Sequence, residues 1–134
     1  MSRTTLKGVR VLLVEDQMIV ALEVESILET FGCVVVGPAA RLDAAIRMAR
    51  EEALDAAILD VNLDGVSIDP VVKELRARGV PILLVTGYGA SMLPDPLQGL
   101  SCLEKPIRDA DLEASLIRLC QGRERDATGH RGRG

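Results

Sequence analysis

The chain has 134 residues, 48% of them hydrophobic, and a formal net charge of −4. Its length suits one domain with its own core, and its hydrophobic content argues against a disordered chain. The acidic balance argues against general nucleic-acid binding, which usually needs a basic face, and no apolar run approaches the ~20 residues of a membrane span.

Strands and helices are predicted to alternate along the chain. Short apolar runs rich in Val, Leu and Ile predict buried strands, and apolar residues at helical spacing predict the helices between them. In chain order these are strand 9–14, helix 17–31, strand 33–37, helix 41–52, strand 55–60, helix 69–78, strand 81–86, a weaker strand 100–104 and helix 108–121. Segment 88–98 is the poorest helix candidate, because Pro94 and Pro96 interrupt it. This alternation predicts an open parallel α/β sheet.

The end of the chain has a different composition. Residues 122–134, "GRERDATGHRGRG", are rich in Gly and Arg and lack periodicity, so we expect a domain over 1–121 and a disordered tail. The three cysteines, Cys33, Cys102 and Cys120, are too far apart in sequence for the close pairs of a zinc site or a thioredoxin-like motif. Because no secretion signal precedes them, we expect free thiols in a cytoplasmic protein.

Charged or hydroxyl side chains follow every predicted strand except the second. Because ligands bind outside the carboxyl ends of strands in such a sheet, we expect these side chains at one rim. They are Glu15 and Asp16 after the first strand, Asp60 and Asn62 after the third, Thr86 at the end of the fourth, and Lys105 after the fifth.

The acids of this rim predict a metal site. Three carboxylates within a few ångströms repel one another and raise one another's pKa values, and a hard divalent cation removes that conflict. Mg²⁺ prefers oxygen ligands, usually one or two carboxylates with waters and a phosphate. We expect Asp16, Asp60 and a loop carbonyl near Asn62 to bind it, with Glu15 holding a water.

A carboxylate beside a metal, a lysine and a hydroxyl indicates phosphoryl transfer to that carboxylate. Asp60 would be the nucleophile and carry an acyl phosphate. The metal, Lys105 and the Thr86 hydroxyl would neutralise or hydrogen-bond the phosphoryl oxygens. The other interpretation is a turn, because "NLDG" (62–65) has the composition of one.

Over about residues 8–121, the sequence resembles the receiver domain of two-component response regulators. The motifs are "LLVEDQ" with Glu15 and Asp16, "AILDVNLDG" with Asp60, "LLVTGYG" with Thr86, and "LEKPI" with Lys105. The resemblance implies a doubly wound, flavodoxin-like fold with five parallel strands in the order 2-1-3-4-5. It also implies that Asp60 accepts phosphate from a phosphohistidine, and that the Lys105–Pro106 bond is cis.

One position departs from the family pattern. Receivers commonly carry Tyr or Phe in the fifth strand, three residues before the lysine, where this chain has Cys102. The "TGYG" stretch is similar to that of a subgroup of stand-alone receivers without this aromatic residue. Tyr88, two residues after Thr86, is the natural substitute for the switching role.

Three functions remain open. The first is a stand-alone receiver, not an enzyme, that a histidine kinase or phosphotransfer protein phosphorylates in a phosphorelay. We expect it to be a monomer or weak dimer that signals through contacts with a downstream protein. The second is a receiver-like interaction module that works without phosphorylation, against which the intact acid pair, Thr86 and Lys105 argue. The third is a phosphohydrolase, which would need a separate general acid or base near Asp60 that the sequence does not offer.

Overall fold

A computed structural model describes the backbone of residues 6–87 and 93–133, and the side chains of these residues as far as Gly122. Helices and strands alternate along most of the chain. The elements are β1 (Arg10–Val14), α1 (Met18–Thr30), β2 (Val34–Ala39), α2 (Leu42–Glu51), β3 (Ala56–Asp60), β4 (Asn62–Leu63), β5 (Val66–Ser67), α3 (Asp69–Ala77), β6 (Ile82–Thr86), the 3₁₀ helix η2 (Asp95–Leu97), β7 (Ser101–Glu104) and α4 (Asp109–Arg133).

Five parallel strands form the central sheet, in the order β2-β1-β3-β6-β7. Numbered as the predicted strands, this is the order 2-1-3-4-5, so the expected doubly wound fold is confirmed. Every residue of β3 and β6 is buried. Their continuous apolar runs fit this position, because the inner strands of a parallel sheet are covered on both faces.

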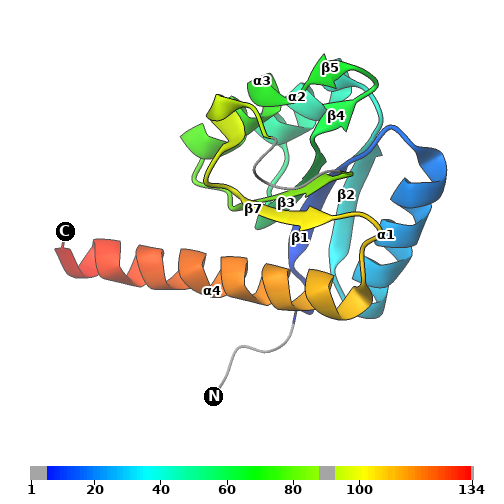
Figure 1. The fold of residues 1–134 in the computed structure, drawn as a ribbon. Helices are drawn as coiled ribbons and strands as arrows, with labels where there is room; N and C mark the ends of the chain where they lie inside the picture. The colour runs from blue at the N-terminus through cyan, green and yellow to red at the C-terminus, as the bar shows by residue number, and fades with distance from the viewer. Residues whose placement is uncertain (1–5, 88–92, 134) are drawn as a thin grey trace.

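Two layers of core lie on the two faces of the sheet. Successive residues of β1 alternate between them: Leu12 packs with α2 and α3, and Leu13 packs with α1 and α4. In Figure 1, α1 and α4 lie apart from the pair α2 and α3, with the sheet between them. The carboxyl ends of the strands therefore remain the open edge.

A small hairpin follows β3 directly. Strands β4 and β5 pair antiparallel, and the turn between them is Asp64-Gly65, with φ values of 52° and 80°. Two positive φ values suit an Asp-Gly pair in a two-residue hairpin turn. The turn is closed by Gly65 N–H, which donates to Asn62 Oδ1 at 2.8 Å. The turn predicted from "NLDG" is thus confirmed, but the two short strands beside it were not predicted.

The last helix differs most from the prediction. It was expected to end at residue 121 and give way to disorder, but α4 continues to Arg133. Figure 1 shows this part of the helix running on past the sheet. The helix was predicted to end at residue 121 because the apolar residues at helical spacing stop there. Backbone hydrogen bonds, however, can continue a helix beyond its last apolar residue. Arg, Glu and Ala favour this, and an interior glycine such as Gly122 costs only about 1 kcal/mol.

No helix in the described part of the chain is both long enough and apolar enough to cross a membrane, although α4 has 25 residues. In the described part of the segment expected to be the poorest helix, residues 93–98, the structure has the 3₁₀ turn η2, which Pro94 precedes. Tyr88 lies outside the described residues, so its switching role stays a prediction.

Candidate functional site

The predicted site residues meet at the carboxyl edge of the sheet. β3 lies between β1 and β6, which places Asp60 between the acids that follow β1 and Thr86 at the end of β6. A pocket of about 420 Å³ opens there. It is lined by Asp16, Gln17, Asp60, Asn62, Asp64, Gly65, Thr86, Gly87 and Lys105. Glu15 completes the predicted set from behind the pocket, where only 4% of it is exposed.

Three carboxylates gather in this place. Glu15, Asp16 and Asp60 each have an oxygen within 4.8 Å of the other two. Burial raises the pKa of the Asp60 carboxyl above its ordinary value, and a hydrogen bond and like charge from Glu15 raise it further. The Lys105 ammonium and the Asn62 backbone N–H lower that pKa in part. Ionised Asp60 is therefore under electrostatic strain in the free protein.

Lys105 supplies the positive charge beside these acids. Its Nζ lies 3.4 Å from Glu15 Oε1, 3.5 Å from Asp60 Oδ2 and 3.4 Å from Gln17 Oε1. These distances are long for hydrogen bonds, so one ammonium is shared among three oxygens. The backbone holds Lys105 in place, because its N–H donates to Thr86 O at 2.8 Å. The Lys105–Pro106 bond is cis, as the family resemblance implies.

The loop after β3 holds the other side of the Asp60 carboxylate. Asn62 N–H donates to Asp60 Oδ1 at 3.2 Å. The side-chain oxygen of Asn62 closes the hairpin turn, so the metal contact predicted for this loop falls to a backbone carbonyl. Thr86 is 1% exposed and lies on the wall of the pocket.

The donor set fits a hard divalent cation. Three acidic side chains converge, and among the residues whose side chains are described, Lys105 is the basic one that pairs with Glu15 and Asp60. Carboxylate oxygens are the ligands that Mg²⁺ prefers, and a cation would remove the repulsion that raises the pKa of Asp60.

Gln17 is one of four pocket residues that were not predicted for the site; the others are Asp64, Gly65 and Gly87. Gln17 follows the acid pair directly and starts α1, where a glutamine has no obvious task. The nearest signal was its place in "VEDQ", one residue beyond Asp16. Cys102, which stands where many receivers have an aromatic residue, is partly buried against the core layer of α2 and α3.

A curated relative shares much of the sequence. The phyllosphere-induced regulator PhyR of Methylorubrum extorquens is 31% identical over 111 residues. The match covers 78% of this chain but 40% of that protein, so the chain spans less than half of PhyR.

Solved structures share the fold. The receiver domain of the sensor histidine kinase PA1611 from Pseudomonas aeruginosa, which has a magnesium ion in its active-site cleft, is 28% identical with a TM-score of 0.74. That match covers 85% of this chain and 98% of the other. PhyR from Brucella abortus is 22% identical with a TM-score of 0.85, over 98% of this chain and 55% of that one, and shows the fold alone.

A family model covers the strands, the acid cluster and the lysine together. It describes the response regulator receiver domain and matches residues 11–117, from β1 into α4. This range holds all six residues predicted for the site: Glu15, Asp16, Asp60, Asn62, Thr86 and Lys105. The chain belongs to the response regulator receiver domain family.

Proposed function

We propose that the chain accepts a phosphoryl group on Asp60 from a phosphohistidine of a histidine kinase or phosphotransfer protein. The signal then passes to a downstream protein by contact. One observation carries the proposal: Lys105 Nζ lies 3.5 Å from Asp60 Oδ2, beside two further carboxylates and in an open pocket. A buried acid that faces an open pocket beside a lysine and two further carboxylates supports the role of a nucleophile in phosphoryl transfer.

In the proposed reaction, a carboxylate oxygen of Asp60 attacks the phosphorus. The bond from phosphorus to the donor nitrogen breaks, its electron pair stays on the imidazole, and an acyl phosphate remains on Asp60. Asn62 N–H and Lys105 hold the carboxylate in place before the attack. Lys105 and the Thr86 hydroxyl then bind the phosphoryl oxygens, where transition-state charge is spread.

Asp16, Asp60 and a backbone carbonyl near Asn62 would hold Mg²⁺, with Glu15 acting through a water. The ion would supply positive charge against the phosphoryl oxygens and the crowded carboxylates. The magnesium ion in the cleft of the PA1611 receiver domain supports this part of the proposal.

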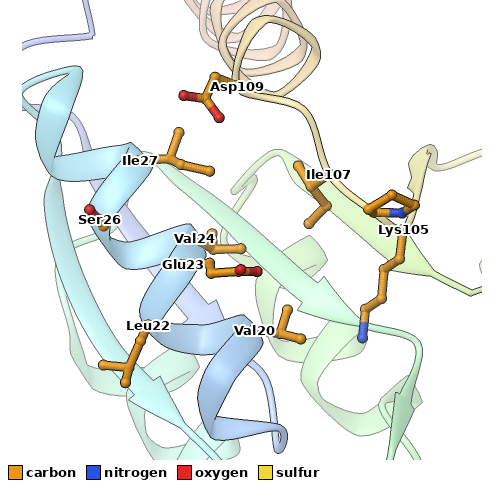
Figure 2. Close-up of a pocket in the computed structure, with 10 residues that line it drawn as sticks. Val20, Leu22, Glu23, Val24, Ser26, Ile27, Lys105, Ile107 and Asp109 are labelled. Carbon is orange, nitrogen blue, oxygen red and sulfur yellow. The ribbon is translucent and has the colours of Figure 1, made fainter.

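The surface beside the pocket favours a protein as phosphodonor. Met18, Ile19 and Leu22 on α1 are 74%, 75% and 56% exposed, and an exposed apolar patch of this kind marks interaction sites. A groove of about 860 Å³ runs between α1 and the junction of β7 and α4. In Figure 2, Val20 and Val24 of α1 face Ile107 across it, and Lys105 reaches along its edge. A donor that covers this surface would bring its histidine to Asp60.

The test is incubation with acetyl phosphate and Mg²⁺, followed by measurement of the intact mass. The proposal predicts one added phosphoryl group on the wild type and none on Asp60→Asn, which keeps the shape of the side chain and loses the nucleophile. No addition to the wild type would favour an interaction module that works without phosphorylation. Steady hydrolysis of the donor without an adduct would favour a phosphohydrolase.

A further inference from the structure

Gln17 is the neutral member of the three groups around the Lys105 ammonium. We propose that Gln17 is a positioning residue: its side-chain oxygen, 3.4 Å from Lys105 Nζ, holds the ammonium over the pocket so that it meets the incoming phosphoryl group. This inference rests on the proposed phosphorylation of Asp60 and names a residue that controls it.

The geometry gives Gln17 this task. The Lys105 side chain is a flexible four-carbon stem, and 23% of it is exposed. Of its other partners, Glu15 is 4% exposed and does not line the pocket, and Asp60 is 6% exposed and lines it, whereas Gln17 is exposed. Gln17 lines the pocket wall together with Lys105. Its oxygen therefore balances the pull of the two carboxylates and keeps the ammonium at the pocket surface.

The start of α1 supports the same assignment. Gln17 is the N-cap residue of α1, with an extended backbone and no side-chain capping bond. Ser, Thr, Asp or Asn usually occupies this position, because their short side chains bond the first N–H groups of the helix. The Gln17 backbone is fixed on both sides: its N–H donates to Glu15 Oε2 at 3.1 Å, and its C=O accepts from Ala21 N–H at 2.9 Å. A residue that gives up helix capping and instead reaches Lys105 serves the pocket.

A neutral acceptor suits this position better than a charged one. An amide oxygen orients the ammonium and adds no negative charge to a site that already holds three carboxylates. A carboxylate at position 17 would hold Lys105 at least as firmly, but it would add a fourth negative charge and repel the anionic donor. Gln17→Met and Gln17→Glu should therefore both slow phosphorylation, for reasons that one further measurement separates.

The first measurement follows the Lys105 side chain by NMR in magnesium-free buffer. The chain has lysines only at 7, 73 and 105, so the methylene groups next to Nζ are few and Lys105→Arg identifies the Lys105 signal. Because Glu15 and Asp60 remain beside the ammonium in every variant, the measurement reports its position. In the wild type and in Gln17→Glu, we expect nuclear Overhauser contacts between this methylene group and the side chain of residue 17. In Gln17→Met, we expect these contacts to be lost as the ammonium moves toward the two carboxylates. Contacts that persist in Gln17→Met at wild-type strength would overturn the proposal.

The second measurement is the maximal rate of labelling by acetyl phosphate. We expect Gln17→Met to be about threefold slower than the wild type, because the contact is a long, exposed hydrogen bond at the weak end of the usual range. Gln17→Glu should also be slower, although it keeps Lys105 in place. Gln121→Met makes the same chemical change on α4 outside the pocket and should match the wild type. A Gln17→Met rate within twofold of the wild type would refute the positioning role.

The two measurements separate this inference from the proposed function. If the wild type takes up no phosphate, the proposed function fails, and the Lys105 signals still decide whether Gln17 holds the ammonium. If the wild type is labelled and Gln17→Met behaves like it in both measurements, only the positioning role fails.

Discussion

The buried carboxyl of Asp60 affects both the proposed chemistry and the stability of the folded protein. Burial and the neighbouring Glu15 raise its pKa, and Lys105 offsets this only in part. The folded state therefore disfavours the ionised form that the proposed reaction needs. Sites that carry out chemistry commonly hold such unfavourable charges, because the same arrangement serves the reaction.

The raised pKa of Asp60 predicts how stability depends on pH. A carboxyl whose pKa is higher in the folded state than in the unfolded state stabilises the fold below its unfolded pKa. That contribution is lost as pH rises through the folded pKa. At neutral pH in EDTA, Asp60→Asn should therefore melt at a higher temperature than the wild type, because the variant has no buried charge to maintain at this position. The two Tm values should converge as pH falls below the ordinary carboxyl pKa of 3.8. A gap that stays constant with pH would contradict this prediction.

The acid cluster predicts a specific effect of magnesium. Mg²⁺ should raise the Tm of the wild type, because it binds the folded state alone and relieves the repulsion among the carboxylates. Asp16→Asn should remove most of this increase, since it deletes a direct anionic ligand, and Glu15→Gln should remove less, since Glu15 acts through water. Thermal melts across a magnesium series give the comparison. Equal magnesium dependence in wild type and Asp16→Asn would remove Asp16 from the ligand set.

At the scale of elements, the strand ends determine the site. β1, β3 and β6 are adjacent and parallel, so the residues that end or follow them reach one rim although they are about 45 and 25 residues apart in the chain. The helix that follows the acid pair carries the apolar patch of Met18, Ile19 and Leu22 on its exposed side. The acid pair of the site and the apolar patch on α1 are thus only a few residues apart in the chain.

This patch predicts different behaviour with protein and small-molecule donors. The double variant Ile19→Ser and Leu22→Ser should accept phosphate from a phosphorylated histidine kinase about tenfold more slowly or worse, because central apolar contacts dominate interface energies. The kinase is chosen as one that labels the wild type. Labelling by acetyl phosphate should stay within twofold.

Val66→Ser is the matched control for the patch. Val66 is 45% exposed and lies on the β4–β5 hairpin, away from α1. This variant should behave like the wild type with both donors. If the double variant receives phosphate from the kinase at the rate of the wild type, the donor does not dock on this face of α1.

At the scale of the whole molecule, much of the fold could be predicted from the sequence. Continuous apolar runs identified the five strands of the main sheet to within about two residues, because strands buried on both faces leave little alternation. The site residues could be predicted because the sheet brings its strand ends together. The Asp64-Gly65 turn could be predicted from its composition. The strands beside it could not, because they have two residues each and are too short to show an alternating pattern.

Other features depend on side-chain reach or on backbone hydrogen bonds alone. Gln17 meets Lys105 across 88 residues of sequence, and no local pattern indicates such a contact. The end of α4 was misplaced because its continuation has no apolar stripe to detect. Neither the contact of Gln17 with Lys105 nor the continuation of α4 produces a periodic pattern in the sequence.

The domain boundary after residue 121 remains a prediction, and truncation tests it. Among the residues of α4 whose side chains the structure describes, Asp109 to Gly122, the last fully buried one is Leu116, and Leu119 and Cys120 still pack against the core. A chain that ends at Gln121 should therefore keep its Tm within about 2 °C, because the sequence of residues 122–134 offers almost no apolar side chain to a core. A fall of more than about 5 °C would mean that residues 122–134 belong to the folded domain.

The claim that Asp60 itself carries the phosphoryl group can be tested by reduction of the labelled protein with borohydride. Borohydride converts an aspartyl phosphate to homoserine and leaves free aspartate unchanged. Peptide mass mapping after treatment with acetyl phosphate and Mg²⁺ then identifies the residue. If Asp60 carries the phosphoryl group, homoserine appears at position 60 and aspartate stays unmodified at positions 16 and 64. Homoserine at another position, or its absence from a protein that has taken up phosphate, would contradict the assignment of Asp60.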